Sequence, residues 1–291
     1  MIRFPPKKIL VPFDFTEASL DAWGQAKDMA ARFGGEVEAV YVEDLLPGDA
    51  WEPLQARVTP GLRKQIVSHL RTRLGAQAKI HVLEGDPALS ILSLIRRLKP
   101  DLVAMGTTGR RGLSRLWAGS VAEAVVHSSP APVMTLHARA TKIDGVLVPV
   151  NFTDYSEYGL AYAAAAAAAM KLPLTVLHVV SDPARCPNPK FRLNTLVARL
   201  PEEVRKNLDL SVLVKAGAPV ETILTTAGVH SLIALVAHRK SLLQDWVLGT
   251  TAERVLRHSR GPVLAVPSPN RPFQWKRWLP AAEAVSGAAK G

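Results

Sequence analysis

The chain has 291 residues, of which 48% are hydrophobic and 21% are charged, as in a soluble globular protein and unlike a disordered one. This length exceeds what one core usually needs and suits two domains of ordinary size. The formal net charge of +11 would attract phosphates non-specifically, but the excess of Lys and Arg is spread over both halves, so charge alone does not identify a nucleic-acid partner.

The single cysteine, Cys186, excludes a disulfide within the chain and fits a reducing cytoplasm. Charged residues at Lys7 and Asp14 come too early in the chain for the apolar core of a signal peptide. The longest apolar uncharged stretch, residues 158–170, is too short to span a bilayer. We therefore expect a cytoplasmic protein with no membrane segment.

Residues 1–140 alternate short apolar runs with longer amphipathic stretches. The short runs predict strands at residues 9–13, 36–42, 78–83, 102–106 and 132–136. Helices are expected between them, at residues 16–33, 62–74, 88–98 and 120–128. Thr16 and Ser120 suit the N-cap position of two of these helices, because a hydroxyl oxygen can accept from the free amides of a first turn. Strands joined by crossover helices predict a parallel sheet covered on both faces.

Residues 141–268 repeat this alternation. Their strands are expected at residues 146–150, 174–179, 210–214, 232–237 and 263–266. A run of alanines at residues 163–169 lies in the first helix of this copy, where it favours helix and permits close packing. Residues 269–291 have no counterpart in the first copy and form a C-terminal tail.

Direct self-similarity supports a duplication. "KKILVPFDFTEASLDAW" at residues 7–23 reappears as "DGVLVPVNFTDYSEYGL" at residues 144–160, and "GSVAEAVVHSSPAPVMTL" from Gly119 reappears as "GTTAERVLRHSRGPVLAV" from Gly249. Two further pairs lie between these matches in the same order. We therefore predict two domains, residues 1–140 and 141–268, followed by the tail.

The segment "MGTTGRRGLSRLWAGSV" at residues 105–121 follows the fourth expected strand. Ligands of open parallel sheets bind beyond the carboxyl ends of the strands, which is where this segment lies. Gly106 and Gly109 remove side chains where the backbone must turn or let a ligand approach. Gly119 and Ser120 present free amides and a hydroxyl at a helix N-terminus, which favours an anion. The segment therefore predicts a phosphate site.

Several other site types are disfavoured. "VPFDFTEAS" stands after the first strand in place of a GxGxxG loop, and no GxxxxGK[ST] occurs, which argues against a dinucleotide dehydrogenase or a P-loop hydrolase. His81, His127 and His137 lack the spacing of zinc ligands. No Ser/His/Asp set can be assembled from the sequence, so we name no catalytic residue.

The pattern G-x2-G-x9-G-S at Gly106, Gly109, Gly119 and Ser120 resembles the ATP-binding signature of the universal stress protein family. The opening "ILVPFD", the "GDP" turn at residues 85–87 and the closing "SSPAPVMTL" also fall where that family has equivalents, and both copies follow its layout. The resemblance implies two doubly wound α/β domains, each with a five-stranded parallel sheet of order 3-2-1-4-5 and helices on both faces.

The resemblance also implies an ATP site across the strand ends of the first domain. Asp14 would meet the ribose or a metal such as Mg²⁺ near the phosphates, and Val42 would contact adenine through its backbone. The glycines would lie under the ribose and phosphates, and the start of the last helix would receive the phosphate tail. From charge alone we add Arg110, together with Arg111. The expected contact positions are Pro12, Asp14, Val42, Gly106, Gly109, Arg110, Gly119, Ser120 and Val121.

Two of these assignments have simpler alternatives. Asp14 is also suited to be a turn residue or a helix cap, and loop arginines are usually only solvated. The second copy departs from the pattern, with Asn151 in place of Asp14, Val236 in place of Gly106 and Arg239 in place of Gly109. Because these side chains would fill the path of a nucleotide, we expect no ordinary ATP site there, although the Gly249–Thr250 pair persists.

The leading hypothesis is an ATP-binding regulatory protein, with slow ATP hydrolysis at most. Family members commonly pair through the last strand, so "APVMTL" and "GPVLAV" are expected to pair across the two domains, and a further homodimer is left open. One alternative is an interaction protein that needs no nucleotide. Another is an adenosine-nucleotide α-hydrolase, which would need an SGGxDS-like loop that "PFDFTEAS" lacks. Nucleic-acid binding is least favoured, because the basic residues are not interleaved with aromatic ones.

Overall fold

The computed structural model describes residues 4–44, 59–107, 120–136, 143–153, 155–182, 186–229, 231–239 and 246–268. In these ranges strands and helices alternate in two similar series. The first series is β1 (Lys8–Pro12), α1 (Glu17–Phe33), β2 (Glu36–Glu43), α2 (Pro60–Leu74), β3 (Lys79–Glu84), α3 (Pro87–Leu98), β4 (Leu102–Gly106), α4 (Ser120–Ser128) and β5 (Val133–Leu136). The second is β6 (Gly145–Pro149), α5 (Ser156–Met170), β7 (Leu174–Val180), α6 (Pro189–Ala198), α7 (Glu202–Lys206), β8 (Leu210–Ala216), α8 (Pro219–Ala227), β9 (Ser231–Arg239), β10 (Trp246–Leu248), α9 (Thr250–His258) and β11 (Val263–Ser268).

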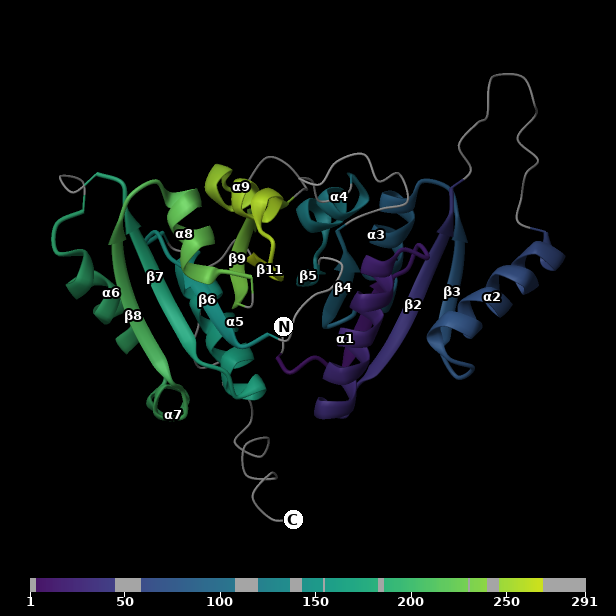
Figure 1. The fold of residues 1–291 in the computed structure, drawn as a ribbon, viewed down its shortest axis with the longest axis horizontal. Coiled ribbons are helices and arrows are strands. Elements are labelled where there is room, and N and C mark those ends of the chain that lie inside the picture. The colour runs from purple at the N-terminus through teal and green to yellow at the C-terminus, as the bar shows by residue number, and fades with distance from the viewer. Residues whose placement is uncertain are drawn as a thin grey trace, which may run out of the picture.

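The strands of both series belong to one sheet (Figure 1). Its order is β3-β2-β1-β4-β5-β11-β9-β6-β7-β8, with β10 paired to β9 off this path. Each series therefore has the order 3-2-1-4-5, and the five strands of each series pair in parallel. The predicted fold class and strand order are confirmed.

The two repeats join through their last strands. β11 pairs antiparallel with β5, in a register that sets Leu264 opposite Met134 and Val263 opposite Thr135. The hydroxyl of Thr135, which is fully buried, donates to the carbonyl oxygen of Val263 at 3.3 Å. The two segments "APVMTL" and "GPVLAV" thus lie side by side, and each strand gives the other a hydrogen-bonded neighbour at what would otherwise be a sheet edge.

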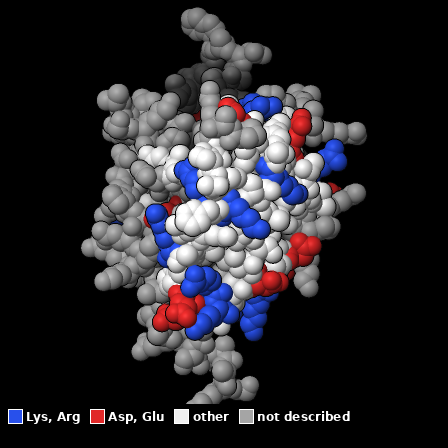
Figure 2. Space-filling model, turned by 90° about the vertical axis from the view of Figure 1, so that its left-hand side faces the viewer, with Lys and Arg blue, Asp and Glu red and all other residues white. Residues whose placement is uncertain are grey.

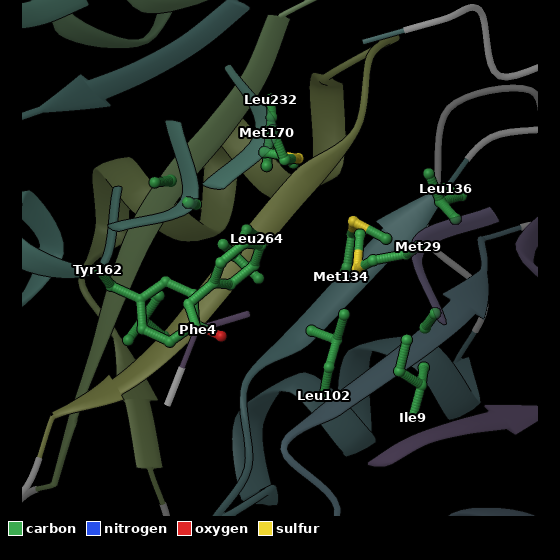
Figure 3. Packing of buried hydrophobic residues seen from close by; sticks show 14 of the residues in the cluster. Phe4, Ile9, Met29, Leu102, Met134, Leu136, Tyr162, Met170, Leu232 and Leu264 are labelled. Carbon is green, nitrogen blue, oxygen red and sulfur yellow. The ribbon is translucent and has the colours of Figure 1, made fainter. Parts of the chain in front are cut away.

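Helices cover both faces of this sheet. Buried side chains of α1, α2, α5 and α6 pack on one face, and those of α3, α4, α8 and α9 pack on the other. Each of the two apolar layers includes residues of both repeats. Figure 3 shows the first layer near the joint, where Leu264 lies beside Tyr162 and Phe4. The hydrophobic core therefore continues from one repeat into the other.

The helix α5 contains the alanine run and is almost entirely buried. Eleven of its residues are buried, five of them alanine. Its Tyr162 ring lies edge-on to Phe4 of the first repeat, with centroids 5.6 Å apart, and Arg32 of α1 donates to the carbonyl oxygen of Met170 at 2.7 Å. Burial, with a smaller contribution from the charge of Asp101, raises the pKa of the Tyr162 phenol. Close packing of a small-residue helix is confirmed.

The starts of the helices α2, α3 and α4 differ from the sequence-based expectations, whereas the start of α1 agrees with them. α2 begins at Pro60, capped by Thr59, and α3 begins at Pro87, where the Asp86 carboxylate accepts from the amide of Leu89 at 2.8 Å. Thr16 caps α1 as expected, accepting from the amide of Ser19 at 3.2 Å. α4 begins at Ser120, so its cap position falls at residue 119, outside the described residues.

The second repeat also contains elements that the sequence did not predict. β9 continues to Arg239, beyond the expected strand end, and β10 pairs antiparallel with it. Pro201 separates α6 from α7. Over the described parts of the chain, every helix falls short of the length and apolar content that crossing a bilayer requires.

Candidate functional site

In the first repeat, the connections that follow β1 and β4 lead to opposite faces of the sheet. These strands are neighbours, yet the helix after β1 packs on one face of the sheet and the helix after β4 packs on the other. A crevice at the carboxyl ends of such a strand pair is the usual ligand site of open α/β sheets. Asp14, Gly106 and Ser120 all come from this edge. Gly109, Arg110 and Gly119 lie outside the described residues.

Asp14 organises the turn between β1 and α1. Its Oδ1 accepts from the amide of Thr16 at 3.1 Å and from the hydroxyl of Thr16 at 2.6 Å. The same Thr16 hydroxyl caps α1, while the amide of Asp14 donates to the hydroxyl of Ser19 at 3.4 Å. Between them, Phe15 has a left-handed backbone with φ +67°. The turn role proposed as the simpler alternative for Asp14 is therefore present.

The second repeat builds the same turn around an amide. Oδ1 of Asn151 accepts from the amide of Thr153 at 3.3 Å and from its hydroxyl at 2.7 Å, and Phe152 has φ +60°. A neutral oxygen is therefore sufficient for this turn. The negative charge of Asp14 therefore distinguishes the strand ends of the two repeats.

Gly106 is required by the packing of α1. A Cβ atom at this position would lie 2.6 Å from the carbonyl carbon of Ala18 and 2.8 Å from the amide nitrogen of Ser19. Its lack of a side chain therefore lets the first turn of α1 approach β4, which is a different reason from the space for a ligand inferred from the sequence.

Val236, at the position equivalent to Gly106 in the second repeat, packs against the helix α5. A Cβ on Gly159 of α5 would lie 2.5 Å from the Cγ2 atom of Val236, so this methyl group packs on the helix. A glycine on the facing helix thus accommodates one methyl group of Val236, and the obstruction of a nucleotide by this side chain stays a prediction. The side chain of Arg239 lies outside the described part.

Pro12 and Val42 occupy the ends of two adjacent strands. Pro12 is buried and stands opposite Val40 in the last register pair of β1 and β2. Because β2 continues to Glu43, the half-buried Val42 lies beyond the end of β1. Its backbone is thus at the carboxyl edge of the sheet, where the adenine contact was expected.

Ser120 and Val121 open the helix α4. Ser120 is exposed and Val121 is half-buried. The first amides of a helix have no partner within it, and they lie at the positive end of its dipole. This end of α4 can therefore receive an anion, and its contact with the phosphate tail stays a prediction.

The described surface and side chains give little support for a nucleic-acid site or for a metal site built by the protein alone. Figure 2 shows the outer end of the second repeat, where Lys and Arg are interspersed with uncharged residues and with Asp and Glu. Among the described residues, no three His, Cys, Asp or Glu side chains come together as a ready metal site. A metal near Asp14 would thus need ligands beyond these described side chains, such as phosphate oxygens.

A family model described as the universal stress protein family matches residues 5–137 and again residues 142–267. The chain belongs to the universal stress protein family. Its two matches show a tandem member with one family unit in each repeat. The expected membership and duplication are therefore confirmed.

Individual universal stress proteins match one or both repeats. One from Methanocaldococcus jannaschii is 36% identical over 140 residues, covering 45% of this chain and 81% of the relative. Another from Synechocystis is 23% identical over 287 residues, covering 89% of this chain and 99% of the relative. The crystal structure of a universal stress protein from Archaeoglobus fulgidus has a TM-score of 0.68 at 21% identity and covers 91% of this chain and 99% of its own, which supports the tandem fold.

One cluster of side chains, formed around Cys186, was not predicted from the sequence. It lies in the second repeat, where His178 of β7 meets Cys186 and Arg192. Cys186 lies eight positions after His178 in the chain, and no motif marks the pair. Only the return of the chain from β7 to α6 brings them together.

Proposed function

We propose that the chain binds ATP at the carboxyl ends of β1, β2 and β4 and that nucleotide occupancy regulates its contacts with partners in the stress response. The single observation that carries this proposal is the carboxylate of Asp14 after the carboxyl end of β1, which neighbours β4 at the edge where α4 also begins. The cytoplasm, where ATP is abundant, is the compartment in which we expect this binding to take place.

Three features support the assignment to the first repeat. Asp14 carries a charge that its turn does not need, since Asn151 makes the equivalent hydrogen bonds without one. α4 offers an anion its N-terminal amides at Ser120 and Val121. The segment between β4 and α4 has a glycine pattern that resembles that of ATP-binding family members, and its Arg110 adds positive charge. Bound Mg²⁺ would be shared between Asp14 and the phosphates of the nucleotide.

The test exploits the paired turns. Asp14→Asn keeps the oxygen that accepts from Thr16, so the variant should fold like the wild type, as Asn151 shows for the second repeat. It removes the charge that would meet Mg²⁺, so we expect ATP affinity in the presence of Mg²⁺ to fall about tenfold or more. Isothermal titration calorimetry of the purified chain, stripped of bound nucleotide, measures this change.

Asn151→Asp is the matched control and should leave the affinity unchanged. Absence of binding by the wild-type chain at millimolar ATP would refute the proposal. The interaction protein that needs no nucleotide would then be the better interpretation. Equal effects of the two substitutions would show that the site is assigned to the wrong repeat.

A further inference from the structure

A nucleophile, a base and a cation meet in the second repeat. The sulfur of Cys186, which is half-buried, lies between β7 and α6. Nε2 of His178 lies 3.5 Å from this sulfur, and a guanidinium nitrogen of Arg192 lies 3.7 Å from it. Cys186 is the only cysteine of the chain, and this contact set lies outside the nucleotide site proposed above.

The environment of His178 fixes which of its nitrogens is the base. The side chain is only 7% exposed, and its Nδ1 lies 2.8 Å from the carbonyl oxygen of Val150. A carbonyl oxygen only accepts, so Nδ1 carries a proton, and Nε2 of the neutral ring is the acceptor. The acceptor nitrogen therefore faces the sulfur and can take the thiol proton.

Arg192 is held beside the sulfur by an aromatic ring. Its guanidinium carbon lies 4.4 Å from the centroid of the Phe152 ring, and that ring lies 4.3 Å from the ring of His178. A guanidinium next to a thiol stabilises the thiolate, which is the nucleophilic form. In the first repeat the equivalent ring pair is Phe15 and Tyr41, with centroids 5.4 Å apart, so a phenol replaces the base there.

We propose that Cys186 is a site of oxidation by hydroperoxides, made reactive by His178 and Arg192. The thiol proton passes to Nε2 of His178, and the thiolate attacks one oxygen of hydrogen peroxide. An S–O bond forms, the O–O bond breaks, and the leaving hydroxide takes the proton from the imidazolium to become water. The sulfur is oxidised by two electrons to a sulfenic acid, and the peroxide is reduced by two electrons to water.

The sulfenic acid of Cys186 can form a disulfide only with a thiol of another molecule. With a single cysteine, the chain cannot form an internal disulfide. The sulfenic acid would instead condense with a thiol such as glutathione, forming a mixed disulfide and releasing water. The two repeats would then carry different chemistry at the carboxyl ends of their own strands, and this site does not depend on the binding of ATP.

The test measures how fast the thiol of the full chain is lost in excess hydrogen peroxide at pH 7. Dimedone trapping and intact mass identify the sulfenic acid, and Cys186→Ser supplies the blank. The wild-type chain unfolded in urea provides the reference rate of an unassisted cysteine. We expect the folded thiol to react about tenfold faster or more than this reference.

Two variants test whether His178 and Arg192 make the thiol of Cys186 reactive. His178→Asn keeps an amide donor for the carbonyl of Val150 but removes Nε2, and Arg192→Gln removes the exposed cation. Each should slow the oxidation about threefold or more while the thermal midpoint stays near that of the wild type. If His178→Asn does not fold, Arg192→Gln decides alone. A folded thiol no faster than the unfolded reference, or a folded variant as fast as the wild type, would overturn the proposal.

Discussion

At the scale of single residues, a glycine lets the first helix of each repeat pack closely on the fourth strand, but this glycine lies on the strand in one repeat and on the helix in the other. In the first repeat the glycine is on the strand, since Gly106 lets the backbone of α1 approach β4. In the second repeat the glycine is on the helix, since Gly159 accommodates the methyl group of Val236. The sequence pattern that marks a nucleotide site is therefore also a packing pattern, and Gly106 serves the fold whether or not ATP is bound.

We expect Gly106→Ala to lower the free energy of unfolding by about 1–3 kcal/mol, because its Cβ would meet the backbone of α1, which cannot rotate away. Gly24→Ala, within α1, is the control. Beyond its chain neighbours and the backbone of its own helix, no described atom lies within 4 Å of the Cβ it would add, and alanine favours helix, so stability should rise by about 0.5–1 kcal/mol. Urea denaturation measures both, and equal effects would contradict the packing role of Gly106.

The contact between Gly159 and Val236 predicts coupled substitutions. Gly159→Ala alone should destabilise the chain by about 1–3 kcal/mol, because the new Cβ would lie 2.5 Å from Cγ2 of Val236. Adding Val236→Ala removes that methyl group and should restore part of the loss. A double-mutant cycle from urea denaturation gives the interaction free energy, and strictly additive effects would refute the contact.

At the scale of whole elements, the pattern of apolar runs and the internal repeat of the sequence were sufficient to predict most strands. Buried parallel strands are continuous apolar runs bounded by turns. β10 was missed because it has only three residues, and its pairing with β9 depends on how the chain returns. Asp14 and Ser120 were placed at the correct edge, since strand ends share an edge in a parallel sheet. The contact of His178 with Cys186 could not be predicted, because it depends on the path of the segment between β7 and α6.

The alanine helix α5 predicts a graded response to larger side chains. Ala166 is fully buried against the layer that both repeats share, whereas Ala168 is half-buried. Ala166→Leu should cost about 1–3 kcal/mol of unfolding free energy, because a close-packed interior has no room for three further carbon atoms. Ala168→Leu should cost clearly less. Thermal and urea unfolding compare the two, and equal losses would show that α5 is not held by close packing on that face.

At the scale of the whole molecule, the two repeats share a sheet, two apolar layers and a bridge of charges. Besides the pairing of β5 with β11, Arg257 of α9 contacts Glu123 of α4 at 2.9 Å and Glu253 of its own helix at 3.1 Å. This bridge is partly exposed, so it contributes less than the buried layers do. The family units are therefore duplicated in sequence but joined in one structure, and we expect them to unfold together.

Met134 of β5 tests this cooperation, because it is 1% exposed and stands opposite Leu264 of the other repeat. Met134→Ala leaves a cavity at the joint and should lower the free energy of unfolding by about 2–5 kcal/mol. If the repeats unfold as one unit, native-state hydrogen exchange should speed up by a similar factor in β1 and in β6, although the substitution lies in neither strand. Hydrogen exchange followed by mass spectrometry resolves the two segments. Faster exchange in β1 with unchanged exchange in β6 would mean that each repeat unfolds independently and that the shared layers do not couple them.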